Sequence, residues 1–141
     1  MRAGLRLHET RVETDVPFHH VDALRIVWHG HYPKYFELAS TALLQKLGLD
    51  SGEIGGTRFK MVVIDSAVRH SFPMRYADRV EICAWISEYA RRVTVRYEIR
   101  NLTHDKRTAR GHTTLATLDD EGRLRLETPP EIAARIAGDS R

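Results

Sequence analysis

Residues 16–40 read VPFHHVDALRIVWHGHYPKYFELAS, and the spacing of apolar residues changes at Pro33. From Pro33 onward, apolar residues recur three and four positions apart, which is the period of a helix. The stripe and the residues that widen it are Phe36, Ala39, Leu43 and Leu47, with Leu38, Ala42 and Leu44. Proline favours the first turn of a helix, and glycine favours its C-terminal cap. The pattern therefore predicts one long helix over 33–47, buried on most sides and capped by Gly48.

Segments on both sides of this helix alternate apolar and polar residues, which is the period of a strand. One such segment, 11–18, precedes the helix, and four follow it, over 61–72, 80–87, 93–100 and 109–119. Short polar links join the last three of these segments, so we expect consecutive strands to pair as hairpins. The glycine-rich loop 51–57 is expected to be a connector, and Pro129–Pro130 to start a short helix. This order predicts an α+β fold in one domain, residues 1–141, with an antiparallel sheet wrapped around one long central helix.

The composition of the 141 residues excludes several classes of protein. With 42% hydrophobic and 29% charged residues, neither a membrane span nor a disordered chain is expected. The net charge is only +3 and the arginines are scattered, which disfavours nucleic-acid binding but leaves room for a smaller phosphate-bearing ligand. A single cysteine, Cys83, and an N-terminus without a signal-like apolar run favour the reducing cytoplasm. On the strands, Cys83 and Trp85 should face away from the helix, and such a half-exposed sheet often binds a partner subunit.

Asp22 stands out because it precedes the helix start within an apolar context. It lies seven residues before His29, and the residues between them are ALRIVW. A carboxylate in such a loop is partly desolvated and can act as a base or nucleophile. Main-chain N–H groups at a helix start can hold a developing oxyanion, so the pairing suits acyl transfer. The alternative is that Asp22 caps a turn or the helix.

Three stretches of the chain resemble one family. Residues 18–36 look like the opening motif of hot-dog-fold acyl-CoA thioesterases of the 4-hydroxybenzoyl-CoA thioesterase type. FPMRYADRVEI, over 72–82, and ARGHTTLATLDDEGR, over 109–123, are similar to two later motifs of that family in the same order. The resemblance extends from about 12 to 125. It implies the hot-dog fold and hydrolysis of an acyl-CoA, or a related carrier-protein thioester, to a free acid and a thiol.

The resemblance also implies roles for individual residues. Asp22 takes the position of the catalytic carboxylate, acting as nucleophile or general base, and the main-chain N–H of His29 polarises the thioester carbonyl. Tyr32, at the helix start, is expected to contact substrate. Arginines on polar faces and links are expected to contact the CoA phosphates, and the candidates are Arg91, Arg92 and Arg110. The family implies a homodimer or homotetramer, and no metal or other cofactor.

The sequence departs from the family pattern at two places. Phe18 stands where some relatives have tyrosine, so a hydroxyl contribution from that position is missing. Leu24 and Arg25 stand where relatives commonly have glycine, which bears on the shape of the loop and of the acyl pocket beside it.

Other interpretations of these residues compete with thioester hydrolysis. The spacing of His29 and His31, with His19 and His20 nearby, could suit a metal, but no second acid or cysteine completes a ligand set. A hot-dog dehydratase would use histidine with an acid, and a non-catalytic subunit would bind an acyl thioester without cleaving it. Cys83 has no histidine partner and is expected to be a packed thiol. Tyr76 and Asp78 are expected to define a strand start, with a ligand contact as the alternative.

Overall fold

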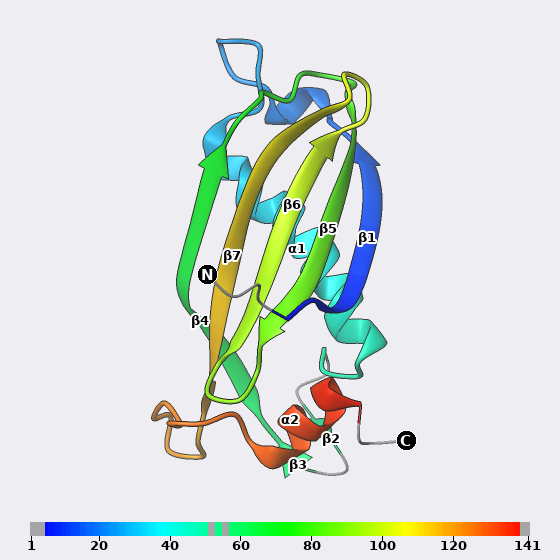
Figure 1. Ribbon diagram of the computed structural model, residues 1–141. Coiled ribbons are helices and arrows are strands. Elements are labelled where there is room, and N and C mark those ends of the chain that lie inside the picture. Colours follow the sequence, from blue (N-terminus) through cyan, green and yellow to red (C-terminus); the bar gives the residue numbers. More distant parts are fainter. Residues whose placement is uncertain (1–4, 51–52, 55–56, 139–141) are drawn as a thin grey trace.

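The computed structural model describes residues 5–50, 53–54 and 57–138, which form one sheet, one long helix and several short elements (Figure 1). In chain order the elements are β1 (Leu7–Asp15), η1 (Phe18–His20), η2 (His29–His31), α1 (Tyr32–Lys46), β2 (Glu53–Ile54), β3 (Thr57–Arg58), β4 (Lys60–His70), β5 (Arg79–Glu88), β6 (Val93–Asn101), β7 (Lys106–Leu118) and α2 (Pro130–Ala137). The two η elements are single 3₁₀ turns.

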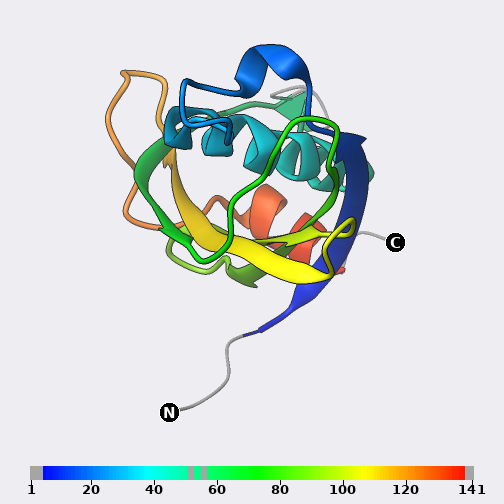
Figure 2. The ribbon, with the colours of Figure 1, turned by 90° about the horizontal axis from the view of Figure 1, so that it is seen from above.

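The five long strands form one antiparallel sheet in the order β1-β5-β6-β7-β4. Seen along its length, the sheet curls around α1, which lies in the concave side (Figure 2). Consecutive strands β5, β6 and β7 are neighbours, as the short links predicted. The α+β architecture with an antiparallel sheet wrapped around one helix is therefore confirmed, and β4 and β1 form the two edges of the sheet.

The core lies between one stripe of α1 and the concave face of the sheet. On the helix, the side chains of Tyr35, Phe36 and Leu43 are at most 3% exposed, and the Phe36 ring stacks on Tyr97 with 4.4 Å between centroids. The prediction that the helix is buried on most sides is wrong for this chain. Leu38 is 48% exposed, because a single sheet can cover only one side of the helix. The fully buried apolar residues of the sheet are Val80, Ile82, Ala84, Ile86, Val95, Ile99 and Ala109.

Element ends differ from the sequence prediction in a few places. β1 ends at Asp15 instead of residue 18, since the Val16 N–H donates to the Asp78 carbonyl at 2.9 Å, outside the ladder, and Pro17 has no N–H to donate. Gly48 has a φ of +70°, the left-handed cap that was predicted. In the predicted connector, β2 pairs with β3, and residues 51, 52, 55 and 56 lie outside the described part.

The convex face of the sheet carries Cys83 and Trp85, as predicted, and arginines cover both. Cys83 is opposite Arg11 in the register and only 4% exposed, so burial raises the pKa of its thiol. The Arg6 guanidinium lies 3.6 Å from the centroid of the Trp85 ring. These features favour the packed-thiol interpretation of Cys83. Among the described residues, no helix is both long enough and apolar enough to cross a membrane.

Candidate functional site

Asp22 lies in a short loop that is closed at its base. A main-chain bridge joins Val21 to Val27, and the Trp28 N–H donates to the His20 carbonyl at 3.0 Å. The Val27 N–H donates to the Met74 carbonyl at 2.8 Å, which fastens the loop to the segment between β4 and β5. The loop therefore has a fixed position at one end of the sheet, beside the start of α1 (Figure 1).

The Asp22 carboxylate is half-buried and caps the tip of this loop. Its Oδ1 accepts the Leu24 N–H at 2.8 Å, so the turn-capping interpretation holds for one oxygen. Within the described residues, no hydrogen bond or ion pair reaches Oδ2. The loop tip is more exposed than its apolar composition predicted, since Leu24 is 77% exposed in the single chain. Arg25 has a φ of +67°, so an arginine adopts here the left-handed conformation that glycine would favour.

The helix start presents unused main-chain donors next to this loop. Residues His29–His31 form a 3₁₀ turn that continues directly into α1. The N–H groups of His29 and Gly30 find no main-chain acceptor in the described part of the chain. Because the partial positive charge of a helix dipole lies at its N-terminus, these donors can hold an oxyanion. The structure thus places a carboxylate and two open N–H groups on one closed loop and the turn that follows it.

Tyr32 lies in the core instead of in an open pocket. Its side chain is 3% exposed, and its ring packs against His70 at the end of β4, with 4.4 Å between ring centroids. Burial raises the pKa of the Tyr32 phenol to about 12, so the phenol is protonated at neutral pH. The substrate contact predicted for Tyr32 stays a prediction, and in this chain its ring supports the helix start from inside.

A histidine cluster supports the loop from the side of β1. His20 stacks on His31 with 4.5 Å between ring centroids, and His20 Nδ1 lies 2.7 Å from the Tyr35 hydroxyl. Burial lowers the pKa of both histidines, and the nearby Lys34 ammonium adds to the effect. No group of three or more histidine, cysteine or acidic side chains among the described residues is arranged to hold a metal. The sequence pointed to the histidines but not to Tyr35, whose hydroxyl meets His20 only through folding.

The three arginines proposed as phosphate contacts do not form one cluster. Arg91 and Arg92 lie in the link between β5 and β6, at the opposite end of the sheet from Asp22 (Figure 1). Arg92 donates to the main-chain carbonyls of Arg125 and Leu126, at 3.0 and 3.1 Å, so it holds the 119–126 loop in place. Arg110 is opposite Glu98 in the β6–β7 register, about 20 Å along the sheet from Arg92 at roughly 3.3 Å per residue.

Asp78 and Tyr76 belong to the start of β5. The Asp78 carboxylate is 5% exposed and accepts the Arg75 N–H at 2.9 Å and the Asn101 side-chain amide at 2.8 Å. Both bonds reach Oδ2, and His104 Nε2 lies 3.5 Å from Oδ1, so both oxygens of the buried carboxylate have a partner, which favours the strand-start interpretation. Tyr76 is exposed and meets the edge of the Phe18 ring, with 5.5 Å between centroids.

An apolar groove runs along α1 from its first turn. Its volume is about 260 Å³, and it lies between the helix and the β4 edge of the sheet. Pro33 and Leu44 mark its two ends on the helix, and Val63 and Val68 line it from β4. Val63 is 57% exposed, so the groove is open along the sheet edge. An acyl chain that reached the open N–H groups of the helix start could continue into this groove.

The chain is similar in sequence to known proteins. The family model described as the thioesterase-like superfamily matches residues 16–136. YneP of Bacillus subtilis (strain 168), a protein named as an acyl-CoA thioesterase, is 27% identical over 83 residues, which are 59% of this chain and 60% of that protein.

Solved structures match the chain over most of its length. A 1,4-dihydroxy-2-naphthoyl-CoA thioesterase from Synechocystis is 18% identical with a TM-score of 0.76, covering 92% of this chain and 96% of that one. A DHNA-CoA thioesterase from Staphylococcus aureus is 23% identical with a TM-score of 0.71, covering 84% and 80%. At these identities the structures establish a shared fold.

The histidine cluster predicts how stability depends on pH. The pKa values of His20 and His31 are lowered in the folded chain. Near pH 6.5, the ordinary pKa of histidine, the unfolded chain therefore binds more protons than the folded chain does. The free energy of unfolding should therefore fall between about pH 7 and pH 5, and the double variant His20→Asn, His31→Asn should show a flatter profile. Thermal unfolding followed by circular dichroism across this range checks the prediction. A wild-type profile as flat as that of the variant would contradict it.

Proposed function

Because this chain belongs to the thioesterase-like superfamily, we propose that it hydrolyses an acyl-CoA thioester to a free acid and a thiol. One observation above all supports the proposal. Within the described part of the chain, the Asp22 carboxylate keeps one oxygen without a partner, and the open N–H groups of His29 and Gly30 follow on the same fixed segment. Acyl transfer needs this combination of a positioned base or nucleophile and donors for the developing oxyanion. The names of YneP and of the naphthoyl-CoA thioesterase agree with it.

The proposed reaction uses the His29 N–H and the Asp22 carboxylate together. The thioester carbonyl oxygen points at the His29 N–H, where the dipole of α1 adds to the hydrogen bond as negative charge develops. As general base, Asp22 takes a proton from water while the water oxygen attacks the carbonyl carbon. Collapse of the tetrahedral state breaks the C–S bond, and the leaving thiolate takes up the proton. As nucleophile, Asp22 attacks the carbonyl carbon directly, and the C–S bond breaks to release the thiolate and leave an anhydride on Asp22. Water then cleaves the anhydride, which restores the Asp22 carboxylate and releases the acid, and a proton from this water protonates the thiolate. Both routes need the carboxylate ionised.

We further propose that the working unit is at least a homodimer. β4 is an edge strand, and its unpaired main-chain groups form a template for another strand. Val63 and Ile64 on this strand are 57% and 43% exposed. The apolar groove along α1 opens on the same edge, so a second copy of the chain placed there would close it. A tetramer would join two such dimers.

The CoA end of the proposed substrate is polyanionic because it carries phosphates. Of the two arginines in the β5–β6 link, Arg91 is the better candidate to bind these phosphates. Arg91 is exposed and its guanidinium makes no hydrogen bond or ion pair within the described residues, whereas Arg92 is occupied by carbonyl oxygens. A free guanidinium can bind a phosphate through two parallel hydrogen bonds. Arg92 is then a positioning residue for this link.

The first prediction separates the catalytic role of Asp22 from its capping role. In Asp22→Asn the amide oxygen can still accept the Leu24 N–H, so the melting temperature should stay close to wild type. Hydrolysis of acyl-CoA substrates should fall by about a hundredfold or more, since the amide is neither base nor nucleophile. Thiol release measured over a panel of acyl-CoAs checks this prediction. Asp105→Asn, which removes an exposed carboxylate that the proposed reaction does not use, serves as the control. Activity within a few-fold of wild type in folded Asp22→Asn protein would rule out the assignment. Loss of water from a hydroxyacyl thioester without thiol release would identify a dehydratase, and binding of an acyl-CoA without any product would identify a non-catalytic binder.

The second prediction concerns the β4 edge. Val63→Lys places a positive charge on the exposed edge strand. In a symmetric dimer formed at this edge, the lysines of the two copies would repel each other. The dimer should therefore separate into monomers and lose most of its activity. Leu126→Lys changes a residue that is 81% exposed away from this edge and should leave the oligomeric state unchanged. Multi-angle light scattering checks both variants. A wild-type monomer with full activity would contradict the proposal.

The third prediction tests the carrier end of the substrate. Arg91→Gln should raise the KM for an acyl-CoA by about tenfold, the loss of one charge-assisted contact, and should leave the KM for the matching acyl-pantetheine unchanged. Salt should weaken binding of the CoA form more than that of the pantetheine form. Equal kinetics and equal salt response for the two forms would argue against nucleotide recognition and in favour of a carrier-protein thioester.

A further inference from the structure

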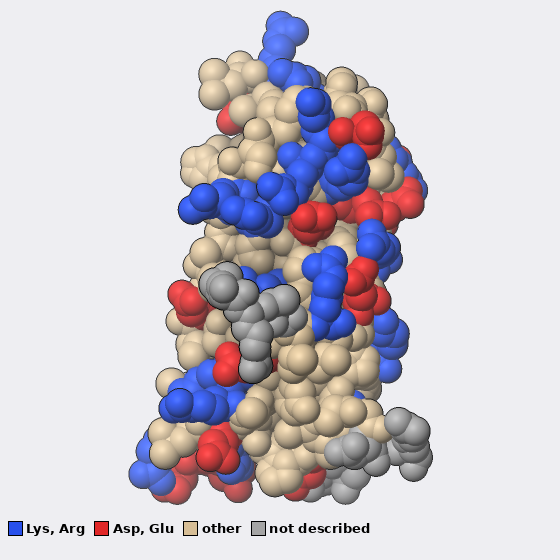
Figure 3. Space-filling model, viewed as in Figure 1, with Lys and Arg blue, Asp and Glu red and all other residues tan. Residues whose placement is uncertain are grey.

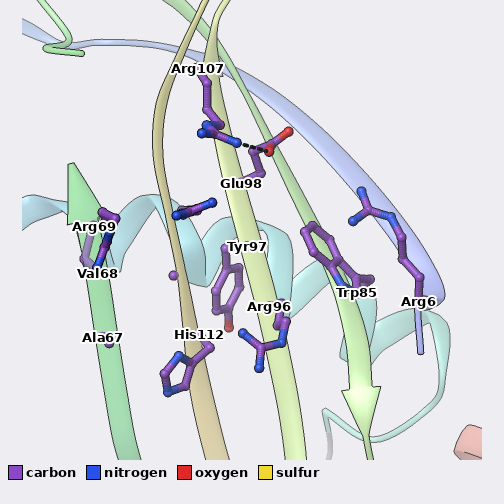
Figure 4. Close-up of a pocket in the computed structure, with 12 residues that line it drawn as sticks. Arg6, Ala67, Val68, Arg69, Trp85, Arg96, Tyr97, Glu98, Arg107 and His112 are labelled. Carbon is purple, nitrogen blue, oxygen red and sulfur yellow. Dashed lines mark ion pairs between the residues drawn. The ribbon is translucent and has the colours of Figure 1, made fainter. Parts of the chain in front are cut away.

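The convex face of the sheet contains a groove that the proposed reaction does not use. Its volume is about 460 Å³, and its lining comes from β4, β5, β6, β7 and the residue before β1. The lining has five arginines and one glutamate (Figure 4). In the space-filling view, Lys and Arg side chains form a band across this face (Figure 3). We call it the arginine groove, and its charged residues are Arg6, Arg69, Arg96, Arg107, Arg110 and Glu98.

The strand register places like charges directly opposite each other in the arginine groove. Arg69 on β4 is the direct partner of Arg110 on β7, and Arg110 is in turn the direct partner of Glu98 on β6. The Glu98 carboxylate lies 3.6 Å from Arg107, which is the ion pair drawn in Figure 4. Within the described residues, Glu98 therefore forms an ion pair with Arg107 alone.

Three of the five guanidinium groups have no acidic partner in the part of the chain that the structure describes. Within the described residues, no carboxylate lies within 4.0 Å of Arg69, Arg96 or Arg110, and Arg96 donates only to the Ser87 hydroxyl, at 3.2 Å. On the same face of the sheet, by contrast, Arg11 is held by two carboxylates, Glu9 at 2.6 Å and Glu81 at 2.9 Å. The arginine groove therefore holds unpaired positive charge, whereas Arg11 on the same face is neutralised.

Such an arrangement is unfavourable without an anion. Like charges directly opposite each other on neighbouring strands destabilise a sheet, and Arg69 and Arg110 form such a pair. A bound anion would convert this repulsion into attraction. Arginine is suited to the task because its planar fork matches the oxygens of a phosphate.

We propose that the arginine groove is a binding site for a compact polyphosphate, such as pyrophosphate or the diphosphate of a nucleotide. Arg69, Arg110 and Arg96 lie on three consecutive strands, β4, β7 and β6, which span roughly 10 Å at about 4.8 Å per strand. That width suits two or three linked phosphates better than a single carboxylate. Trp85, with Arg6 stacked on it, closes the groove on the β5 side. This assignment places Arg110 in the arginine groove, apart from Arg91.

The diphosphate could come from two sources that share this chemistry. It could be the diphosphate of the CoA substrate itself, in which case the assignment rests on the proposed function and the arginine groove, instead of Arg91, holds that diphosphate. It could equally be a free nucleotide that binds independently of the reaction. Direct binding of inorganic pyrophosphate tests the site in both cases, because the measurement needs no hydrolysis.

The experiment is calorimetric titration of the full chain with inorganic pyrophosphate at low salt. Wild type should bind saturably, Arg69→Gln and Arg110→Gln should each bind about tenfold more weakly or worse, and Arg110→Lys should be intermediate because it keeps the charge but loses the fork. Arg11→Gln removes an arginine that is already neutralised on the same face and should bind within about twofold of wild type. Pyrophosphate should also raise the melting temperature of wild type and not that of Arg110→Gln.

No saturable binding by wild type at millimolar pyrophosphate, or an equal loss in Arg11→Gln, would overturn the proposal. Once pyrophosphate binding is established, ADP distinguishes the two sources of the diphosphate. If ADP competitively inhibits hydrolysis of an acyl-CoA, the groove binds the substrate. If ADP binds without inhibiting hydrolysis, the groove binds a free nucleotide. Asp22→Asn should bind pyrophosphate like wild type. Failure of the thioesterase proposal would therefore appear in the activity assay alone, and failure of the groove proposal in the titration alone.

Discussion

The packing of one apolar stripe of α1 into the concave face of the sheet is the interaction on which the other features depend. Phe36, stacked on Tyr97, and Leu43, fully buried, fix the helix against the central strands. Gly111 on β7 permits this close approach, since a Cβ at that position would collide with the Ala67 carbonyl and the Phe36 ring. Complete burial of one such side chain stabilises the fold by about 1.5–3 kcal/mol, so the helix has one well-defined position.

A fixed helix gives a fixed helix start, and the catalytic proposal rests on that consequence. The loop that carries Asp22 is tied to the segment before β5 by Val27 and to η1 by Trp28, while the buried ring of Tyr32 packs on His70 below it. The main-chain donors and the carboxylate are thereby held by separate contacts around the same end of the sheet. Preorganised donors of this kind do not have to be ordered again when charge develops on the substrate.

The two faces of the sheet have different chemistry for a physical reason. The concave face is filled by apolar side chains, so charged residues of β5, β6 and β7 are confined to the convex face by the two-residue period of the strands. On that face, carboxylates neutralise Arg11 near β1, whereas Arg69 on β4 has no carboxylate partner among the described residues. The β4 side of the molecule therefore combines an open sheet edge, an apolar groove on one face and an excess of positive charge on the other.

The sequence by itself determined the elements whose signals are local: the period of α1, the alternation of β5 to β7, the cap at Gly48 and the motif around Asp22. Periodicity states which residues share a face, but not what covers that face, so Leu38 was expected to be buried and is exposed. Only the tertiary structure showed that Arg92 is occupied by the carbonyls of a distant loop. It alone decided that His20 meets Tyr35 and that Arg69 faces Arg110. These contacts depend on strand register and loop closure, which are set by the packing of the whole chain and leave no local trace in the sequence.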